Sequence, residues 1–77
     1  MEKRSALAMA AAIKFLPCNI GRKSWFEVTE VGEVVFYTNQ PSLFLIPEDA
    51  GNWHYSSEEG GFVSNDGLKI TVSPCQI

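Results

Sequence analysis

The sequence predicts an α+β fold in which one N-terminal helix packs on a small antiparallel sheet of four to five strands built from hairpins. Three observations lead to this prediction. An Ala-rich segment with helical periodicity opens the chain, short runs of β-branched and aromatic residues follow, and glycine-containing turn signals separate those runs. With 77 residues, of which 45% are hydrophobic, the chain suits one small domain spanning residues 1–77.

The helix is predicted from Ser5 to Leu16. Ser5 suits the N-cap, because its hydroxyl can accept a hydrogen bond from a backbone N–H of the first turn. The apolar residues at helical spacing are Ala6, Met9, Ile13 and Leu16. They share one face, which we expect to lie on the sheet. Pro17 cannot continue a helix and ends it.

The first hairpin is predicted from strand-like segments at 25–31 and 34–38. Gly32-Glu33 between them fits a two-residue turn with glycine first. That register pairs Val31 with Val34, Thr29 with Phe36, and Val28 with Tyr37. Because side chains alternate along a strand, Glu27 and Glu30 are expected on opposite faces of it.

Four more segments with strand character follow towards the C-terminus. The apolar run at 42–46 suits a central strand buried on both faces, and 53–56 suits a further short strand. The last hairpin joins 62–65 to 68–72 through Asp66-Gly67, which is a strong two-residue turn signal. In that register Val63 pairs with Ile70, and Phe62 pairs with Thr71.

The charges are sorted along the chain. Residues 1–23 hold five basic residues and one acidic residue, a net +4, whereas residues 24–77 hold one basic and eight acidic residues, a net −7. The overall −3 therefore combines a basic head with an acidic body. Such asymmetry favours a binding function over a catalytic one.

Residue types that carry chemistry are few. His54 is the only histidine, and its neighbours Trp53 and Tyr55 favour a packed histidine over a general base. The adjacent acids at 48–49 and 58–59 are typical of solvated loops, and two cysteines with one histidine cannot build a structural zinc site. The sequence therefore predicts neither an enzyme nor a bound cofactor or metal.

Cys18 and Cys75 lie far apart in the sequence, so a disulfide between them would close most of the chain into one loop, with a stabilisation of about 4 kcal/mol. The favoured interpretation is two reduced cysteines in a cytoplasmic protein. The apolar run at 7–13 is at the short limit for a secretion signal and too short to span a membrane. An exported, disulfide-closed domain remains an alternative.

Arg22, Lys23, Trp25 and Phe26 form a short basic-aromatic cluster that could contact phosphate and stack a base. The acidic body would repel a nucleic-acid backbone over most of the surface, so direct nucleic-acid binding is not expected.

The favoured function is therefore a stand-alone binding protein whose carboxylates imitate phosphates and occupy a basic nucleic-acid-binding surface of one protein or nucleoprotein partner. The candidate contact residues are Glu27, Glu30, Glu33, Glu48, Asp49, Glu58 and Glu59, with Trp53 and Tyr55 as aromatic anchors if they are exposed. In general character, though not in any motif, this profile resembles inhibitors of host defence encoded by phages and mobile elements, such as anti-CRISPR and anti-restriction proteins. The alternative is a phage structural or assembly protein, or a homo-oligomeric interaction module. We expect a monomer or homodimer with no membrane partner.

Overall fold

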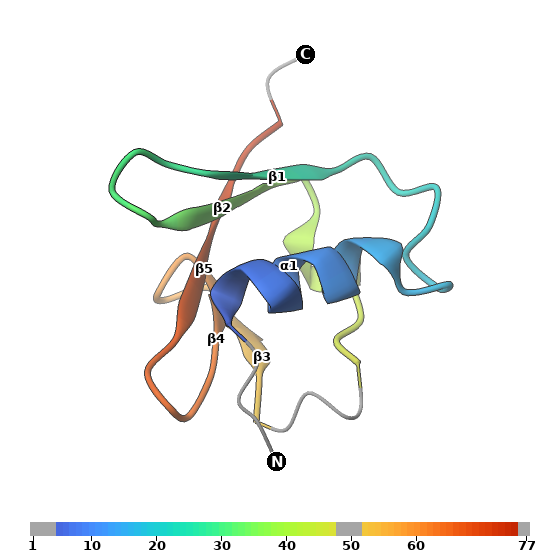
Figure 1. Ribbon diagram of the computed structural model, residues 1–77. Helices are drawn as coiled ribbons and strands as arrows, with labels where there is room; N and C mark the ends of the chain where they lie inside the picture. The colour runs from blue at the N-terminus through green and yellow to red at the C-terminus, as the bar shows by residue number, and fades with distance from the viewer. Residues whose placement is uncertain (1–4, 48–51, 76–77) are drawn as a thin grey trace.

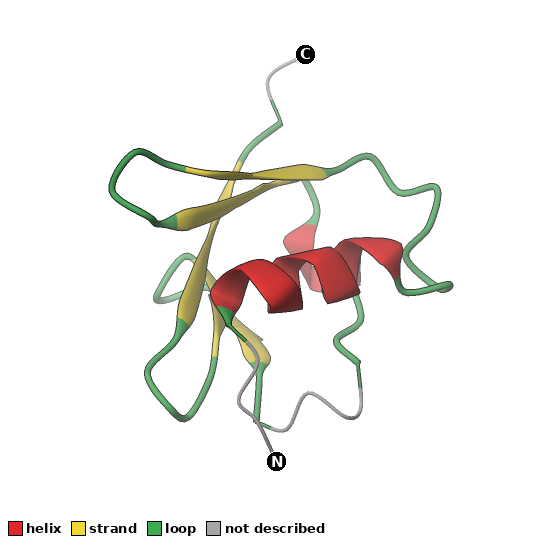
Figure 2. Ribbon diagram, viewed as in Figure 1, coloured by secondary structure: helices red, strands yellow, loops and turns green. Residues whose placement is uncertain are grey.

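The computed structural model describes residues 5–47 and 52–75, over which the fold is broadly α+β, as predicted (Figure 1). In chain order the elements are α1 (Ala6–Phe15), β1 (Trp25–Val28), β2 (Val34–Tyr37), the 3₁₀ helix η1 (Pro41–Leu43), β3 (His54–Ser56), β4 (Gly61–Val63) and β5 (Lys69–Ser73). The strands form one sheet in the order β1-β2-β5-β4-β3. Figure 2 shows α1 and η1 on the same side of this strongly twisted sheet.

The sheet is mixed, which corrects the prediction of a purely antiparallel one. β1 and β2 form one antiparallel hairpin, and β3, β4 and β5 form an antiparallel meander. These two units meet where β2 pairs with β5 in parallel. Parallel strands need a long connection between them, and here η1, β3 and β4 supply it.

Helix α1 begins and ends close to its predicted bounds. The Ser5 hydroxyl accepts a hydrogen bond from the backbone N–H of Ala8 at 3.1 Å, as an N-cap residue should. The buried face of α1 consists of Met9, Ala10 and Ile13, and it packs against β1, β2 and β5.

Aromatic side chains fill the space between helix and sheet. Phe36 of β2 is fully buried and makes edge-to-face contacts with two other rings, Phe44 at 5.2 Å and Phe62 at 5.8 Å between centroids. Met9, Ala10, Ile13 and Ile70 complete the fully buried apolar set. This cluster is the one hydrophobic core of the described chain.

The predicted register of the first hairpin is wrong. Val28, not Val31, pairs with Val34, and Phe26, not Thr29, pairs with Phe36. The loop has three residues, 30–32, because the Thr29 N–H donates to the carbonyl of Glu33. Gly32 is its last residue, with φ of +85°, which is the geometry of a turn closed by a glycine bulge.

The last hairpin repeats this arrangement, and its predicted register is wrong for the same reason. Phe62 pairs with Ile70 and Val63 with Lys69, because the loop is 65–67 and Ser64 pairs with Leu68. Gly67 has φ of +90°, whereas no non-glycine residue of the described chain has a positive φ. A two-residue type I′ turn would have required positive φ at Asp66 as well.

The predicted strand at 42–46 does not form. Pro41 begins the 3₁₀ helix η1 instead, and Leu43 and Leu45 are exposed. The backbone of Leu45 pairs with a side chain rather than with a strand. Its N–H donates to Asn19 Oδ1 at 3.0 Å, and its carbonyl accepts from Asn19 Nδ2 at 2.8 Å.

Asn19 is thus a buried polar clamp between two distant segments. Its Nδ2 also donates to the carbonyl of Ile13 near the end of α1, at 2.7 Å, and the residue is only 1% exposed. A buried amide with these partners satisfies backbone groups that the helix and the segment after η1 would otherwise leave unpaired.

Two glycine substitutions should distinguish a glycine that is needed for lack of space, Gly61, from one that is needed for its positive φ, Gly67. Gly61→Ala would push a methyl group into the carbonyl oxygen of Ile70 on the neighbouring strand, so we expect a loss of more than about 3 kcal/mol in unfolding free energy. Gly67→Ala meets no atoms but must keep a positive φ, so we expect a loss of about 1–2 kcal/mol. Urea denaturation measures both, and equal losses would contradict the close approach at Gly61.

Candidate functional site

The candidate interaction surface is the sheet face opposite α1, termed here the outer face. The register places Trp25 and Glu27 of β1 on it, beside Tyr37 and Val35 of β2 and Ser73 and Thr71 of β5. In the described residues, α1 and η1 both lie on the other side of the sheet (Figure 1). The central part of this face is therefore not covered by a helix.

An aromatic pair marks one end of the outer face. Trp25 and Tyr37 pair directly across β1 and β2, and their rings stack with centroids 5.1 Å apart and planes inclined by 22°. Both side chains are half-buried. Together with Glu27, Ser73 and Pro74 they line an open hollow of about 450 Å³. A π face next to a carboxylate is suited to a cationic side chain of a partner.

Three of the predicted contact residues belong to the same hairpin. Glu27 lies on β1, Glu30 is the first residue of the loop, and Glu33 directly follows the loop; all three are exposed. Between Trp25 and Tyr37 the sequence has no Lys, Arg or His. We call residues 25–37 the acidic hairpin. Since β1 ends at Val28, Glu30 is a loop residue. The prediction that Glu27 and Glu30 lie on opposite faces of one strand is therefore wrong.

The structure does not unite all the predicted acids. Glu58 and Glu59 are exposed in the turn between β3 and β4. That hairpin is separated from the acidic hairpin by β5. Glu48 and Asp49 lie outside the described residues. The predicted contact acids that the structure describes therefore form two groups, one on the acidic hairpin and one on the β3–β4 hairpin, with β5 between these hairpins in the sheet.

Of the two aromatic anchors predicted on the condition of exposure, Trp53 does not meet that condition, whereas Tyr55 is partly accessible. Trp53 is 9% exposed and belongs to the core, while Tyr55 is half-buried against Phe62, with ring centroids 5.6 Å apart. The sequence analysis did not bring Trp25 and Tyr37 together, because the assumed two-residue turn pairs Tyr37 with Val28, whereas the structure pairs it with Trp25. No local signal could have corrected this, since Gly32 fits both the first position of a two-residue turn and the last position of a three-residue loop.

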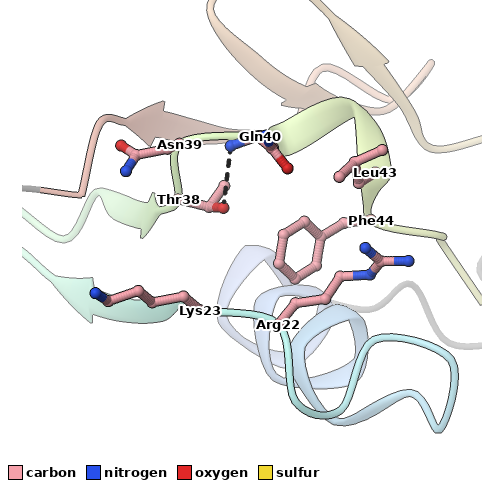
Figure 3. Close-up of a pocket in the computed structure, with 7 residues that line it drawn as sticks. All are labelled: Arg22, Lys23, Thr38, Asn39, Gln40, Leu43 and Phe44. Carbon is pink, nitrogen blue, oxygen red and sulfur yellow. Dashed lines mark hydrogen bonds between the residues drawn. The ribbon is translucent and has the colours of Figure 1, made fainter.

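A second hollow, of about 350 Å³, lies where the loop after α1 meets the chain leaving β2 (Figure 3). We call it the basic hollow; its lining residues are Arg22, Lys23, Thr38, Asn39, Gln40, Leu43 and Phe44. The predicted basic-aromatic cluster is therefore divided. Arg22 and Lys23 line this hollow, Trp25 is on the outer face, and Phe26 packs against the core.

Groups that could support catalysis or metal binding are scattered. His54 is exposed on β3, and the described residues contain no cluster of three or more His, Cys, Asp or Glu side chains that could hold a metal ion. Both thiols are free, with Cys18 exposed and Cys75 buried. No helix within the described ranges has the length and apolar character needed to cross a membrane.

The chain matches no protein-family model, no curated protein and no solved structure. Its arrangement supports binding chemistry at two places: an acidic, aromatic outer face and a basic hollow. The first attracts cations and the second attracts anions.

The two tryptophans should report the register directly. In Trp53→Phe the remaining Trp25 should be readily quenched by acrylamide, because it is half-buried on the outer face, whereas in Trp25→Phe the core residue Trp53 should be protected. Trp53→Phe should also cost about 1–3 kcal/mol in stability, through altered core packing, against about 0.5 kcal/mol for Trp25→Phe. Equal quenching in the two variants would contradict this placement.

Proposed function

We propose that the protein is a small stand-alone inhibitor that binds a basic nucleic-acid-binding surface of one protein partner through its acidic hairpin. The partner class that fits is a nucleic-acid-handling complex of host defence, as for phage-encoded anti-CRISPR-like inhibitors. The observation that carries the proposal is the composition of one edge hairpin, which holds three exposed carboxylates, a stacked aromatic pair and no basic side chain.

Charge supports the choice of partner. The hairpin itself has three carboxylates and no cation, and this charge attracts a positively charged surface; the cation on β5, Lys69, lines a hollow together with Glu33. A nucleic-acid-binding cleft offers such a surface, since Lys and Arg side chains line it to contact phosphates. Occupation of that cleft by the hairpin would exclude the nucleic acid.

The aromatic pair supplies binding affinity that charged residues alone would not provide. Exposed ion pairs contribute little affinity, whereas aromatic residues at the centre of an interface often dominate it. Trp25 and Tyr37 lie on the same face as Glu27, so one Arg or Lys of the partner can contact a ring and a carboxylate together.

One further observation favours the alternative of a homo-oligomeric module. The solvent side of α1 has an apolar stripe in which Leu7 is 46% exposed and Phe15 63% exposed, with Ala11 half-buried between them. Contact between two copies would cover this stripe. Analytical ultracentrifugation of the wild type and of Phe15→Glu distinguishes a dimer formed there from a monomer.

The inhibitor proposal is tested by capturing proteins from a lysate of the source organism on the immobilised chain. We expect a nucleic-acid-binding protein whose retention falls between 0.1 M and 1 M salt, where the screening length drops from about 10 Å to about 3 Å. DNA should compete with the immobilised chain for the captured protein and release it. Recovery of nucleic acid alone, or retention that is insensitive to salt, would overturn the proposal.

A matched pair of double variants locates the contact. Glu30→Gln/Glu33→Gln and Glu58→Gln/Glu59→Gln each remove two exposed charges from a turn. The first should weaken binding of the captured protein about five- to tenfold, while the second should change it less than about twofold. Equal losses would mean a diffuse acidic surface and would exclude the acidic hairpin as the contact element.

A further inference from the structure

We infer that the basic hollow is a binding site for a small phosphate monoester whose organic part is apolar or carries a ring. This inference goes beyond the proposed function, because the hollow shares no lining residue with the outer-face hollow and attracts the opposite charge. It concerns a ligand of this chain and not the protein partner.

The lining of the hollow points to an anion. Arg22 and Lys23 are cationic, the other five lining residues are neutral, and none is acidic. A third cation, Lys14, is bonded to the same chain segment: its Nζ donates a hydrogen bond to the carbonyl of Ser24, the residue next to Lys23. The basic residues at the exit of α1 are thus gathered at one place in a chain that is acidic overall.

The side chain of Arg22 is restrained by a contact with an aromatic ring. Its guanidinium carbon lies 5.9 Å from the centroid of the Phe44 ring, within the range of a cation–π contact. Phe44 is itself buried and fixed against Phe36. Such a contact restrains the guanidinium, so less conformational entropy is lost when its N–H groups bind an anion.

Figure 3 shows how the two cations frame the hollow. Their side chains extend in opposite directions, with the Phe44 ring between their charged ends, while Thr38, Asn39 and Gln40 lie across from them. Asn39 Oδ1 already accepts the Cys75 N–H at 2.8 Å, so the NH₂ group of Asn39 is the part left to donate to a ligand.

Charge and size narrow the ligand class. A phosphate monoester carries between about −1.5 and −2 at neutral pH, which matches two cations better than a single carboxylate does. The hollow, about 350 Å³, is much larger than the roughly 30 Å³ of one water and falls within the range of small-molecule sites. Leu43, which is 46% exposed, and the Phe44 ring supply an apolar wall for the organic part.

The test uses phenyl phosphate, inorganic phosphate and phenol as probes of the folded full-length chain. The readout is the NMR shift of the Asn39 and Gln40 side-chain amides and of the Arg22 Nε–H. We expect saturable shifts with phenyl phosphate, weaker binding of inorganic phosphate, and no saturation with phenol. The inference would be overturned by phenol binding as tightly as phenyl phosphate, or by phosphate shifts that map to Trp25 and Tyr37.

Three variants complete the test. Arg22→Gln and Lys23→Gln should each weaken phenyl phosphate binding about tenfold, as expected for loss of a charge-assisted hydrogen bond. Lys69→Gln removes the same charge from an exposed residue that does not line the hollow, so it should change binding less than about twofold. The Trp53 indole signal verifies that each variant is folded. Equal losses of affinity in all three variants would mean that phenyl phosphate is attracted by the overall charge and not by the basic hollow, and would overturn the inference.

An eight-residue oligothymidylate without a terminal phosphate forms a separate arm. Binding of this strand with no binding of phenyl phosphate would replace the small-ligand site with a nucleic-acid surface and would overturn the inference. The outcome of these ligand tests does not decide the proposed role of the acidic hairpin, because binding of its protein partner is measured separately with the Glu→Gln variants.

Discussion

The register of the β1–β2 hairpin is the constraint on which the surfaces of this protein depend. It is fixed by a three-residue loop in which Gly32 adopts a positive φ and Thr29 pairs with Glu33. The Thr29 hydroxyl reinforces the loop by accepting the N–H of Glu33 at 3.1 Å. Because side chains alternate with period two, this register sends Phe26 towards the core and Trp25 with Glu27 to the outer face. The predicted register differs by three positions and would exchange the two faces.

The opposite side of the domain depends on a buried polar contact. Asn19 joins the end of α1 to the segment after η1 through hydrogen bonds with Ile13 and Leu45. That segment carries Phe44 into the core, where it packs on Phe36 and lies beside Arg22. The Asn19 amide thus provides the Leu45 backbone with the partners that a neighbouring strand would otherwise supply, next to the segment that forms one wall of the basic hollow. One hairpin loop and one side-chain clamp thus position the two surfaces for which binding roles are proposed.

Local signals in the sequence predicted the local structure well. The Ser5 cap, the alanines and Pro17 predicted α1, and the glycines at 32 and 67 correctly located two turns. What these signals could not determine was turn length, since a glycine fits both a two-residue turn and the end of a three-residue loop. The error at Gly32 then reversed the predicted faces of β1. The apolar run at 42–46 was misassigned because periodicity cannot reveal that Asn19, far away in the sequence, satisfies its backbone. The parallel pairing of β2 with β5 is likewise a long-range choice that no local pattern encodes.

The glycine-bulged loop places Trp25 and Tyr37 together on a sheet face that none of the described helices covers. NMR measurement of through-space contacts between side chains tests it most directly. The loop described here predicts contacts between the rings of Trp25 and Tyr37 and between those of Phe26 and Phe36, with none between Val31 and Val34. Contacts between Val31 and Val34 and between Thr29 and Phe36 would establish the two-residue turn instead. That result would turn Trp25 and Glu27 towards the helix and contradict the acidic hairpin as a contact element.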